Sequence, residues 1–238
     1  MLILAIDTST AATSVAVLGA TAGPILRTQI DGRRHAEVVA PLLREALREA
    51  DVDPADIGLV ACGVGPGPFT GLRVGIATAI AFGFARDVPV VGVCSLDVTA
   101  RAAVRDLGTS VTVLSRARKS EVCWASYDDR AMRIAGPIIR REPVNITGAC
   151  VGDAGPVDEV RYPSALDLAE LVVERMALGE ALPDDFALPE DTSTEAGQSS
   201  ATVLVDRVRA ARILLPPRPI YLRRPDAVVP ASLTGGAA

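Results

Sequence analysis

Two hydrophobic periods alternate along the first hundred residues, and this alternation most constrains the fold. Short apolar runs at Leu2 to Ile6, Ser14 to Leu18 and Ile57 to Cys62 are rich in β-branched residues, which is typical of strands. The stretch that begins at His35 and the stretch Leu72 to Arg86 instead place apolar residues at helical spacing. An initial meander followed by alternating strands and helices predicts an α/β protein whose mixed sheet is covered on its faces.

The same pattern restarts after Gly108, which predicts a second α/β unit. We therefore expect two domains, residues 1–106 and residues 107–238. The other expected elements are strands at 25–30, 88–93, 111–114, 122–127, 138–139 and 145–151, and helices at 96–105, 166–176 and 201–214. Residues 182–200 are rich in Asp, Glu, Pro, Ser and Thr and are expected to form an exposed loop.

The charge balance argues against a broad nucleic-acid surface. The chain of 238 residues carries 24 Lys and Arg against 29 Asp and Glu, a formal net charge of −5. Nucleic-acid affinity depends on clustered Lys and Arg, so any contact with RNA must be local or made by a partner. Four cysteines without a CxxC pair are expected to be reduced and buried in a cytoplasmic protein: Cys62, Cys94, Cys123 and Cys150. The apolar start meets Asp7 too early for a signal peptide, and no apolar stretch is long enough for a bilayer.

The most distinctive motif is a glycine-rich loop, residues Gly63 to Gly75, between an expected strand and an expected helix. A phosphate could meet a helix N-terminus at such a place. No lysine follows Gly71, so the loop is not a Walker loop, and Thr70 occupies the third glycine position of the dinucleotide fingerprint. Two interpretations stay open: a phosphate site, or a tight turn in which glycines supply positive φ.

Small residues recur every four positions along the helix after this loop, at Gly71, Gly75, Ala79 and Gly83. This small-residue row lets another element approach closely. The row packs either against the protein's own sheet or against a partner subunit. Since this helix is apolar on nearly all sides, it needs cover on nearly all sides. We expect it to form a partner surface together with the helix that begins at His35. The predicted interface residues are His35, Val39, Leu43, Leu47, Leu72, Gly75, Ile76, Ala79 and Gly83.

Histidine is the residue that excludes most catalytic sites, because His35 is the only one in the chain. Two-histidine metal sites and zincin motifs need more than one, whereas an all-carboxylate magnesium site does not. The acidic candidates are Asp7, Asp97 and Asp153. Asp7 with its neighbouring hydroxyls either coordinates a hydrated cation or forms an Asx turn. We expect no catalytic residue and no bound metal.

Four segments taken together resemble the TsaB (YeaZ) family: Leu4 to Thr10, Gly65 to Gly75, Pro89 to Leu96 and Pro219 to Arg223. The resemblance implies a two-domain actin-like, Hsp70-like ATPase (ribonuclease H-like) fold. It also implies an accessory role in the threonylcarbamoyl modification of adenosine 37 in tRNA. Members of this family pair with the catalytic subunit TsaD and, in bacteria, work with the small ATPase TsaE. By this resemblance, the chain touches tRNA only through the complex.

Three functional classes follow, led by a non-catalytic subunit that supports a TsaD-like partner and forms a homodimer in its absence. The second class is an actin-like ATPase or phosphotransferase that binds ATP or ADP weakly. Its vestigial nucleotide site would comprise Asp7, Thr8, Ser9, Gly65, Gly67, Gly152 and Gly155. The third class is a metallopeptidase of the M22 type. The catalytic relative has a metal-binding histidine pair where this chain has Cys94 to Thr99, which counts against that class.

Overall fold

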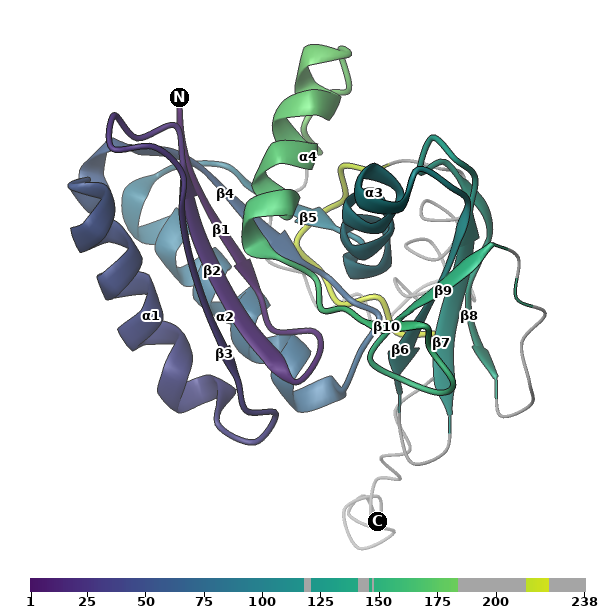
Figure 1. Ribbon diagram of the computed structural model, residues 1–238. Helices are drawn as coiled ribbons and strands as arrows, with labels where there is room; N and C mark the ends of the chain where they lie inside the picture. The colour runs from purple at the N-terminus through teal and green to yellow at the C-terminus, as the bar shows by residue number, and fades with distance from the viewer. Residues whose placement is uncertain (118–120, 141–145, 147, 184–212, 223–238) are drawn as a thin grey trace, which may run out of the picture.

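Two five-stranded mixed sheets form the framework of the computed structural model, which describes residues 1–117, 121–140, 146, 148–183 and 213–222 (Figure 1). The first sheet contains β1 (Leu2–Asp7), β2 (Ala12–Leu18), β3 (Ile25–Ile30), β4 (Ile57–Gly63) and β5 (Val90–Val93). Its order is β3-β2-β1-β4-β5. The pairs β1–β2 and β2–β3 are antiparallel, and β1, β4 and β5 run parallel.

The second sheet repeats this topology. It contains β6 (Val111–Arg116), β7 (Val122–Tyr127), β8 (Arg133–Arg140), β9 (Ala149–Gly152) and β10 (Glu159–Val160). In the order β10-β9-β6-β7-β8, a three-stranded antiparallel meander is again extended by two parallel strands. Two successive sheets of the same mixed topology confirm the α/β class that the periodicity predicts and the actin-like arrangement that the family resemblance implies.

Among the described residues, three of the four α-helices cover the first sheet. The helices are α1 (His35–Ala50), α2 (Phe69–Arg86), α3 (Ser95–Leu107) and α4 (Ala165–Ala177), besides a short 3₁₀ turn at Pro54–Asp56. Successive side chains of a strand point to opposite faces of its sheet. In β1, Leu4 and Ile6 belong to the cluster packed with α1 and α2, whereas Ile3 and Ala5 belong to the cluster packed with α4. Helices α1 and α2 therefore lie side by side on one face, and α4 covers the other (Figure 1).

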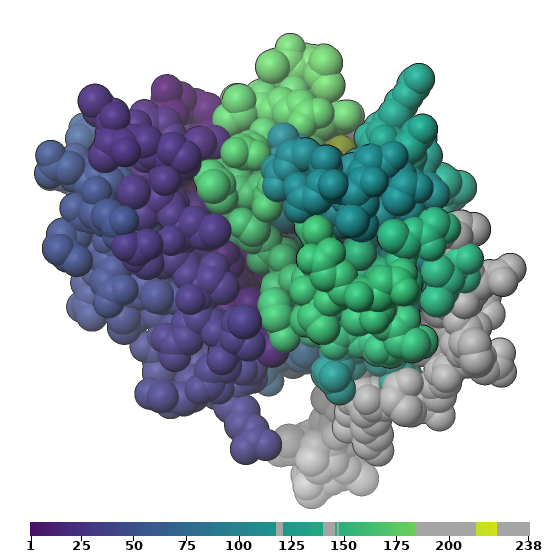
Figure 2. Space-filling model, viewed as in Figure 1, coloured from purple at the N-terminus to yellow at the C-terminus, as the bar shows by residue number. Residues whose placement is uncertain are grey.

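Helices α3 and α4 cross between the two halves of the chain. α3 follows the last strand of the first sheet but packs on β6, β7 and β9 of the second, while α4 returns to the first sheet. In Figure 2, α4 (green) lies between the purple strands of the first sheet and the blue-green α3. Because the two helices also contact each other, they join the sheets. The division at residues 106 and 107 stays a prediction, since packing crosses it in both directions.

Most predicted elements are present with boundaries shifted by a few residues. The strand expected at 138–139 lies near the C-terminal end of the longer β8, and the one expected at 145–151 corresponds to β9, which begins at Ala149. β10 and the 3₁₀ turn were not expected from the sequence. The helix expected at 201–214 and the loop expected at 182–200 lie mostly outside the described residues. None of the described helices combines the length and apolarity needed to cross a bilayer.

The described C-terminal segment, residues 213–222, covers the edge of the first sheet. Leu215 forms a β-bridge with Gly92 of β5, and the Ile220 amide donates to the Val64 carbonyl at 2.8 Å. A Cβ at position 92 would lie 2.6 Å from the Pro216 carbonyl oxygen, so only glycine permits this crossing. The segment thus anchors the end of the chain beside the glycine-rich loop.

Candidate functional site

The carboxylate of Asp7 is the centre of a buried polar cluster at the ends of the parallel strands. Asp7 ends β1 and is 1% exposed. Its Oδ1 accepts hydrogen bonds from the backbone amide of Ser9 at 2.8 Å and from the Ser9 hydroxyl at 2.7 Å. Its Oδ2 accepts a hydrogen bond from the Ser95 hydroxyl at 2.7 Å. The carboxylate is therefore satisfied by three donors of its own chain, in the Asx-turn arrangement that was one of two expectations.

The glycine-rich loop closes over this carboxylate without leaving space. A Cβ added at Gly63 would overlap the Asp7 Oδ2, and one at Gly67 would overlap the Ser9 carbonyl oxygen. Gly65 has φ +84, a conformation that L side chains rarely adopt. The glycines are needed here because backbone and side chains of the same chain fill the space, which is the tight-turn interpretation.

Thr8 joins this cluster to the start of α2. Its hydroxyl donates to the Gly71 carbonyl at 2.7 Å and accepts from the Gly75 amide at 2.9 Å. A Cβ at Gly71 would lie 2.8 Å from the Thr8 carbonyl oxygen, and one at Gly75 would overlap the Thr8 hydroxyl. The close approach predicted for the small-residue row is therefore made with Thr8, directly after β1 of the same chain.

Burial raises the pKa of Asp7 above its usual value, while the hydrogen bonds from Ser9 and Ser95 act in the opposite direction. Desolvation is the larger influence. A buried carboxylate without a nearby cation is an expected feature of a magnesium-nucleotide site. The Asp7 carboxylate, however, already accepts three hydrogen bonds from hydroxyl and amide donors of its own chain.

The residues present do not fit a nucleotide of the actin-like type. The approach to Asp7 is taken by Ser9, Ser95 and glycine backbone. Gly152 ends β9, and the space a Cβ would need there is filled by Leu114 backbone, while Gly155 faces the Leu114 side chain. The described hydrogen bonds of this turn connect it to β6 and Arg161, and none of them reaches Asp7. Within the described chain, no three His, Cys, Asp or Glu side chains gather as metal ligands.

The predicted interface residues lie mostly inside the chain. Eight of the nine are buried, and only Leu43 is partly exposed. The buried members are His35, Val39, Leu47, Leu72, Gly75, Ile76, Ala79 and Gly83. Their side chains pack between the helices and the first sheet because α1 and α2 are the cover of that face. A partner contact on these two helices stays a prediction, and residues exposed between the buried ones must make it.

The outer face of α2 is apolar, which is uncommon for a solvent-exposed helix. Phe84 is 75% exposed, and Ala77 and Ala81 are also exposed on the same side. On the neighbouring α1, Ala36 and Ala40 are exposed although the helical period placed them on its apolar side. We name these five residues the outer helix face. Because this face is apolar and is not used in the internal packing, it is available for contact with another protein.

His35 connects the two helices at the end where both begin. The side chain is 7% exposed, and its Nδ1 shares a hydrogen bond of 2.7 Å with the Thr13 hydroxyl. The ring also lies against Gly71, where a Cβ would come 3.0 Å from Nε2. Burial lowers the pKa of His35 below its usual value, although Asp31 acts against this shift. The single histidine thus has a packing role, which accounts for its place without catalysis.

Stability is expected to fall as the solution is acidified below about pH 6.5, the ordinary histidine pKa. The lowered pKa means that the unfolded chain binds the proton first, so folding loses stability as pH falls toward the folded-state pKa of His35. One proton contributes at most about 1.4 kcal/mol per pH unit. Chemical denaturation of the wild type and of His35→Gln between pH 7.5 and 5 measures how the free energy of unfolding depends on pH. The prediction fails if both proteins show the same pH dependence.

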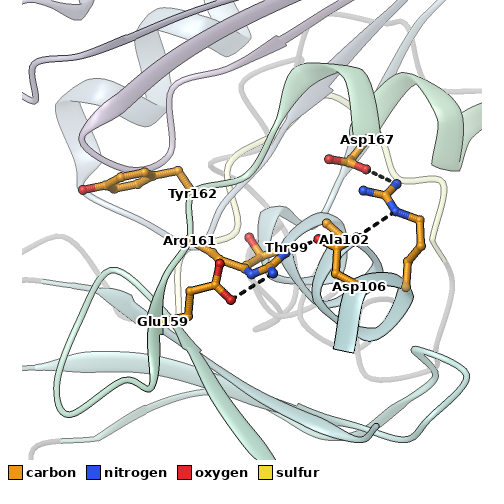
Figure 3. Close-up of a pocket in the computed structure, with 8 residues that line it drawn as sticks. Thr99, Ala102, Asp106, Glu159, Arg161, Tyr162 and Asp167 are labelled. Carbon is orange, nitrogen blue, oxygen red and sulfur yellow. Dashed lines mark hydrogen bonds and ion pairs between the residues drawn. The ribbon is translucent and has the colours of Figure 1, made fainter. Parts of the chain in front are cut away.

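The described pocket with charged walls lies between α3, β10 and the start of α4 and has a volume of about 240 Å³. Arg105 pairs with Asp167 and Asp106, and Figure 3 shows Arg161 directed at Glu159. Arg161 also donates to Asp106 at 2.6 Å. These ion pairs tie α3 to α4 and to the strand before it. The pocket is therefore lined by ion pairs that hold the crossing helices together.

Two residues of the polar cluster and its surroundings were missed by sequence reasoning. Ser95 was not singled out, although it comes just after the end of β5, as Asp7 stands at the end of β1. Since β1, β4 and β5 are parallel neighbours, their carboxyl ends meet, and this signal predicts the Asp7–Ser95 contact. Asp97 was considered as an acidic candidate, but its partner Arg133 carries no local signal. Arg133 comes from β8 of the other sheet.

Comparisons with known proteins find relatives of the same fold. The family model for TsaD, tRNA N6-adenosine threonylcarbamoyltransferase, matches residues 28–194. The solved structure of YeaZ from Pseudomonas aeruginosa is 30% identical with a TM-score of 0.65, and the match covers 75% of this chain and 93% of that one. The chain belongs to the TsaB (YeaZ) family.

Other relatives extend this TsaB-family assignment along the chain. An uncharacterised protein of Mycobacterium tuberculosis is 38% identical over 94% of this chain and 93% of its own length. The tRNA threonylcarbamoyladenosine biosynthesis protein TsaB of Escherichia coli is 37% identical over 53% of this chain and 55% of its own length. The residues matched by the family model include the glycine-rich loop, whose glycines serve close packing here.

Proposed function

We propose that this TsaB-family chain is a non-catalytic subunit of the system that makes the threonylcarbamoyladenosine of tRNA. Its relatives from Escherichia coli and Haemophilus influenzae carry the name of a tRNA threonylcarbamoyladenosine biosynthesis protein. The family model of the threonylcarbamoyltransferase matches most of the chain, which makes a homologous catalytic subunit the partner of choice. The chain's task in this proposal is to bind and support that subunit.

The outer helix face carries the proposal. A phenyl ring that is 75% exposed in the last turn of α2, in line with exposed alanines of the same helix, is costly in water unless another surface covers it. Two helices from each protein would form a four-helix contact, and alanines permit a close approach of the axes. The same face would pair two copies of the chain when the catalytic subunit is absent.

A catalytic role finds little support in the residues. Asp7, the carboxylate best placed for actin-like phosphate chemistry, already accepts three hydrogen bonds from its own chain. Peptidase chemistry of the two-histidine type has one histidine to draw on, and that residue is buried against Thr13. The proposal therefore assigns no nucleotide cofactor and no turnover to the isolated chain.

The remaining partners are those that the family resemblance implies, and the charge of the chain bears on one of them, tRNA. With a net charge of −5, the chain offers no extended phosphate-binding surface, so tRNA is contacted through the complex. A TsaE-like ATPase would act on the assembled pair, and the site of action would be the cytoplasm, where tRNA is modified.

Replacing Phe84 by Ser tests the proposal. Removing an exposed aromatic anchor from one end of the contact is expected to weaken binding of the TsaD homologue about tenfold or more, since 1.4 kcal/mol is tenfold in affinity. The melting temperature should change little because the ring is 75% exposed. Titration calorimetry with the purified TsaD homologue measures the affinity.

Leu178→Ser is the matched control, because Leu178 is 70% exposed at the end of α4 on the other face of the first sheet. It should bind the TsaD homologue like the wild type. The proposal fails if the wild-type chain does not bind, or if both variants bind with wild-type affinity.

A further inference from the structure

Arg73 is an exposed arginine held in one orientation by two aromatic rings. It lies in the second turn of α2, with its guanidinium carbon 3.6 Å from the centroid of the Phe69 ring. Its Nε donates to the Tyr221 hydroxyl at 2.8 Å. The rings of Phe69 and Tyr221 stack with centroids 5.1 Å apart. Tyr221 belongs to the C-terminal segment 213–222, so two distant parts of the chain fix this guanidinium.

The two terminal nitrogens of Arg73 have no hydrogen-bond acceptor among the described residues, because the bond to Tyr221 uses Nε. A planar guanidinium can donate two parallel bonds to one carboxylate. An ordinary surface ion pair contributes little, since ordering two long side chains costs conformational entropy. Phe69 and Tyr221 have already restricted Arg73, so that cost is reduced before any partner arrives.

The position of Arg73 relates it to the outer helix face. Arg73, Ala77, Ala81 and Phe84 follow one another at helical spacing on the exposed side of α2. The charged group therefore stands at one end of an apolar stripe and the phenyl ring at the other. A partner helix packed along this stripe would meet one cation, Arg73. The position of an acidic residue on the partner helix would therefore determine the direction and the register in which that helix docks.

We propose that Arg73 donates a bidentate hydrogen bond to a carboxylate of the catalytic partner and thereby sets the register of docking. The inference rests on the proposed function and adds the chemistry of one contact. A second copy of the chain would have to supply the carboxylate from α1, because α2 from Phe69 to Arg86 contains no acidic residue. In α1, Glu37 and Glu49 already pair with Arg34 and Arg27. An RNA phosphate is disfavoured by the apolar stripe beside the arginine and by the net charge of −5.

Affinity for the purified TsaD homologue is measured for the wild type, Arg73→Gln and Arg73→Lys at low and high salt. Arg73→Gln is expected to weaken binding about tenfold at low salt and to flatten the salt dependence. Arg73→Lys should recover little of the affinity, since an ammonium cannot form the planar fork. Arg130→Gln, an exposed arginine in the turn after β7, is the matched control and should bind like the wild type.

Tyr221→Phe tests the orientation of the guanidinium. The variant keeps the stacked ring but removes the acceptor of Nε, so affinity should fall about threefold with an unchanged melting temperature. The inference is overturned if Arg73→Gln binds normally while Phe84→Ser is weakened, a result that leaves the proposed function intact. It is also overturned if Arg73→Lys restores full affinity, or if Arg73→Gln affects only tRNA binding by the assembled complex. Absence of wild-type binding would instead refute the proposed function.

Discussion

Replacing Arg133 by Met is expected to lower the free energy of unfolding by about 3–5 kcal/mol. Asp97 of α3 and Arg133 of β8 form an ion pair in which the side chains are 3% and 4% exposed. Asp97 also accepts hydrogen bonds from Arg133 Nε at 3.0 Å and from the Tyr127 hydroxyl at 2.7 Å. Methionine fills a similar volume but leaves the buried carboxylate without its cation, and that unpaired charge is the source of the cost.

Thermal and urea denaturation of Arg133→Met measure the loss. Adding Asp97→Asn should recover part of it, because a neutral amide is cheaper to bury than an unpaired carboxylate. Arg34→Met is the control: Arg34 pairs with Glu37, both mostly exposed, and the change should stay within about 0.5 kcal/mol. Equal stability of Arg133→Met and wild type would show that the ion pair does not hold α3 on the second sheet.

Replacing Gly75 by Leu is expected to lower the free energy of unfolding by about 3 kcal/mol or more. A Cβ at this position would overlap the Thr8 hydroxyl, and the next nearest atoms are the Thr8 Cβ and Cγ2 at 3.3 Å. Thr8 is 1% exposed and cannot rotate away without losing its hydrogen bonds to Gly71 and Gly75. Overpacking of about 1–3 kcal/mol therefore adds to the loss of buried hydrogen bonds, each about 1 kcal/mol.

Ala77→Leu is the matched variant, because it places the same side chain two residues away on the exposed side of α2. Its unfolding free energy should stay within about 0.5 kcal/mol of the wild type, while its affinity for the TsaD homologue should change. Melting temperature and affinity are measured on both variants. If Gly75→Leu keeps its melting temperature and loses only partner affinity, the small-residue row faces the partner and not β1.

Local patterns were sufficient for most of the described elements, whereas for the glycine-rich loop they left a phosphate site and a tight turn both open. The helical period that begins at His35 and the strand-like run Ile57 to Cys62 both mark elements of the structure. These signals survive in the sequence because a helix or strand repeats its environment every few residues, at period 3.6 or 2. The family motifs likewise lie in contiguous segments, so the TsaB resemblance is readable without coordinates.

Tertiary structure decided which surface each element meets. The α2 sequence is apolar on nearly all sides, so its periodicity does not show which side is buried. Only the structure shows that Gly75 contacts Thr8 while Phe84 faces solvent. The crossing of α3 to the second sheet and of α4 to the first is equally absent from local pattern. Asp97 and Arg133 meet only because of that crossing. An amphipathic period specifies that a face is buried, but the partner that buries it depends on packing between residues far apart in the chain.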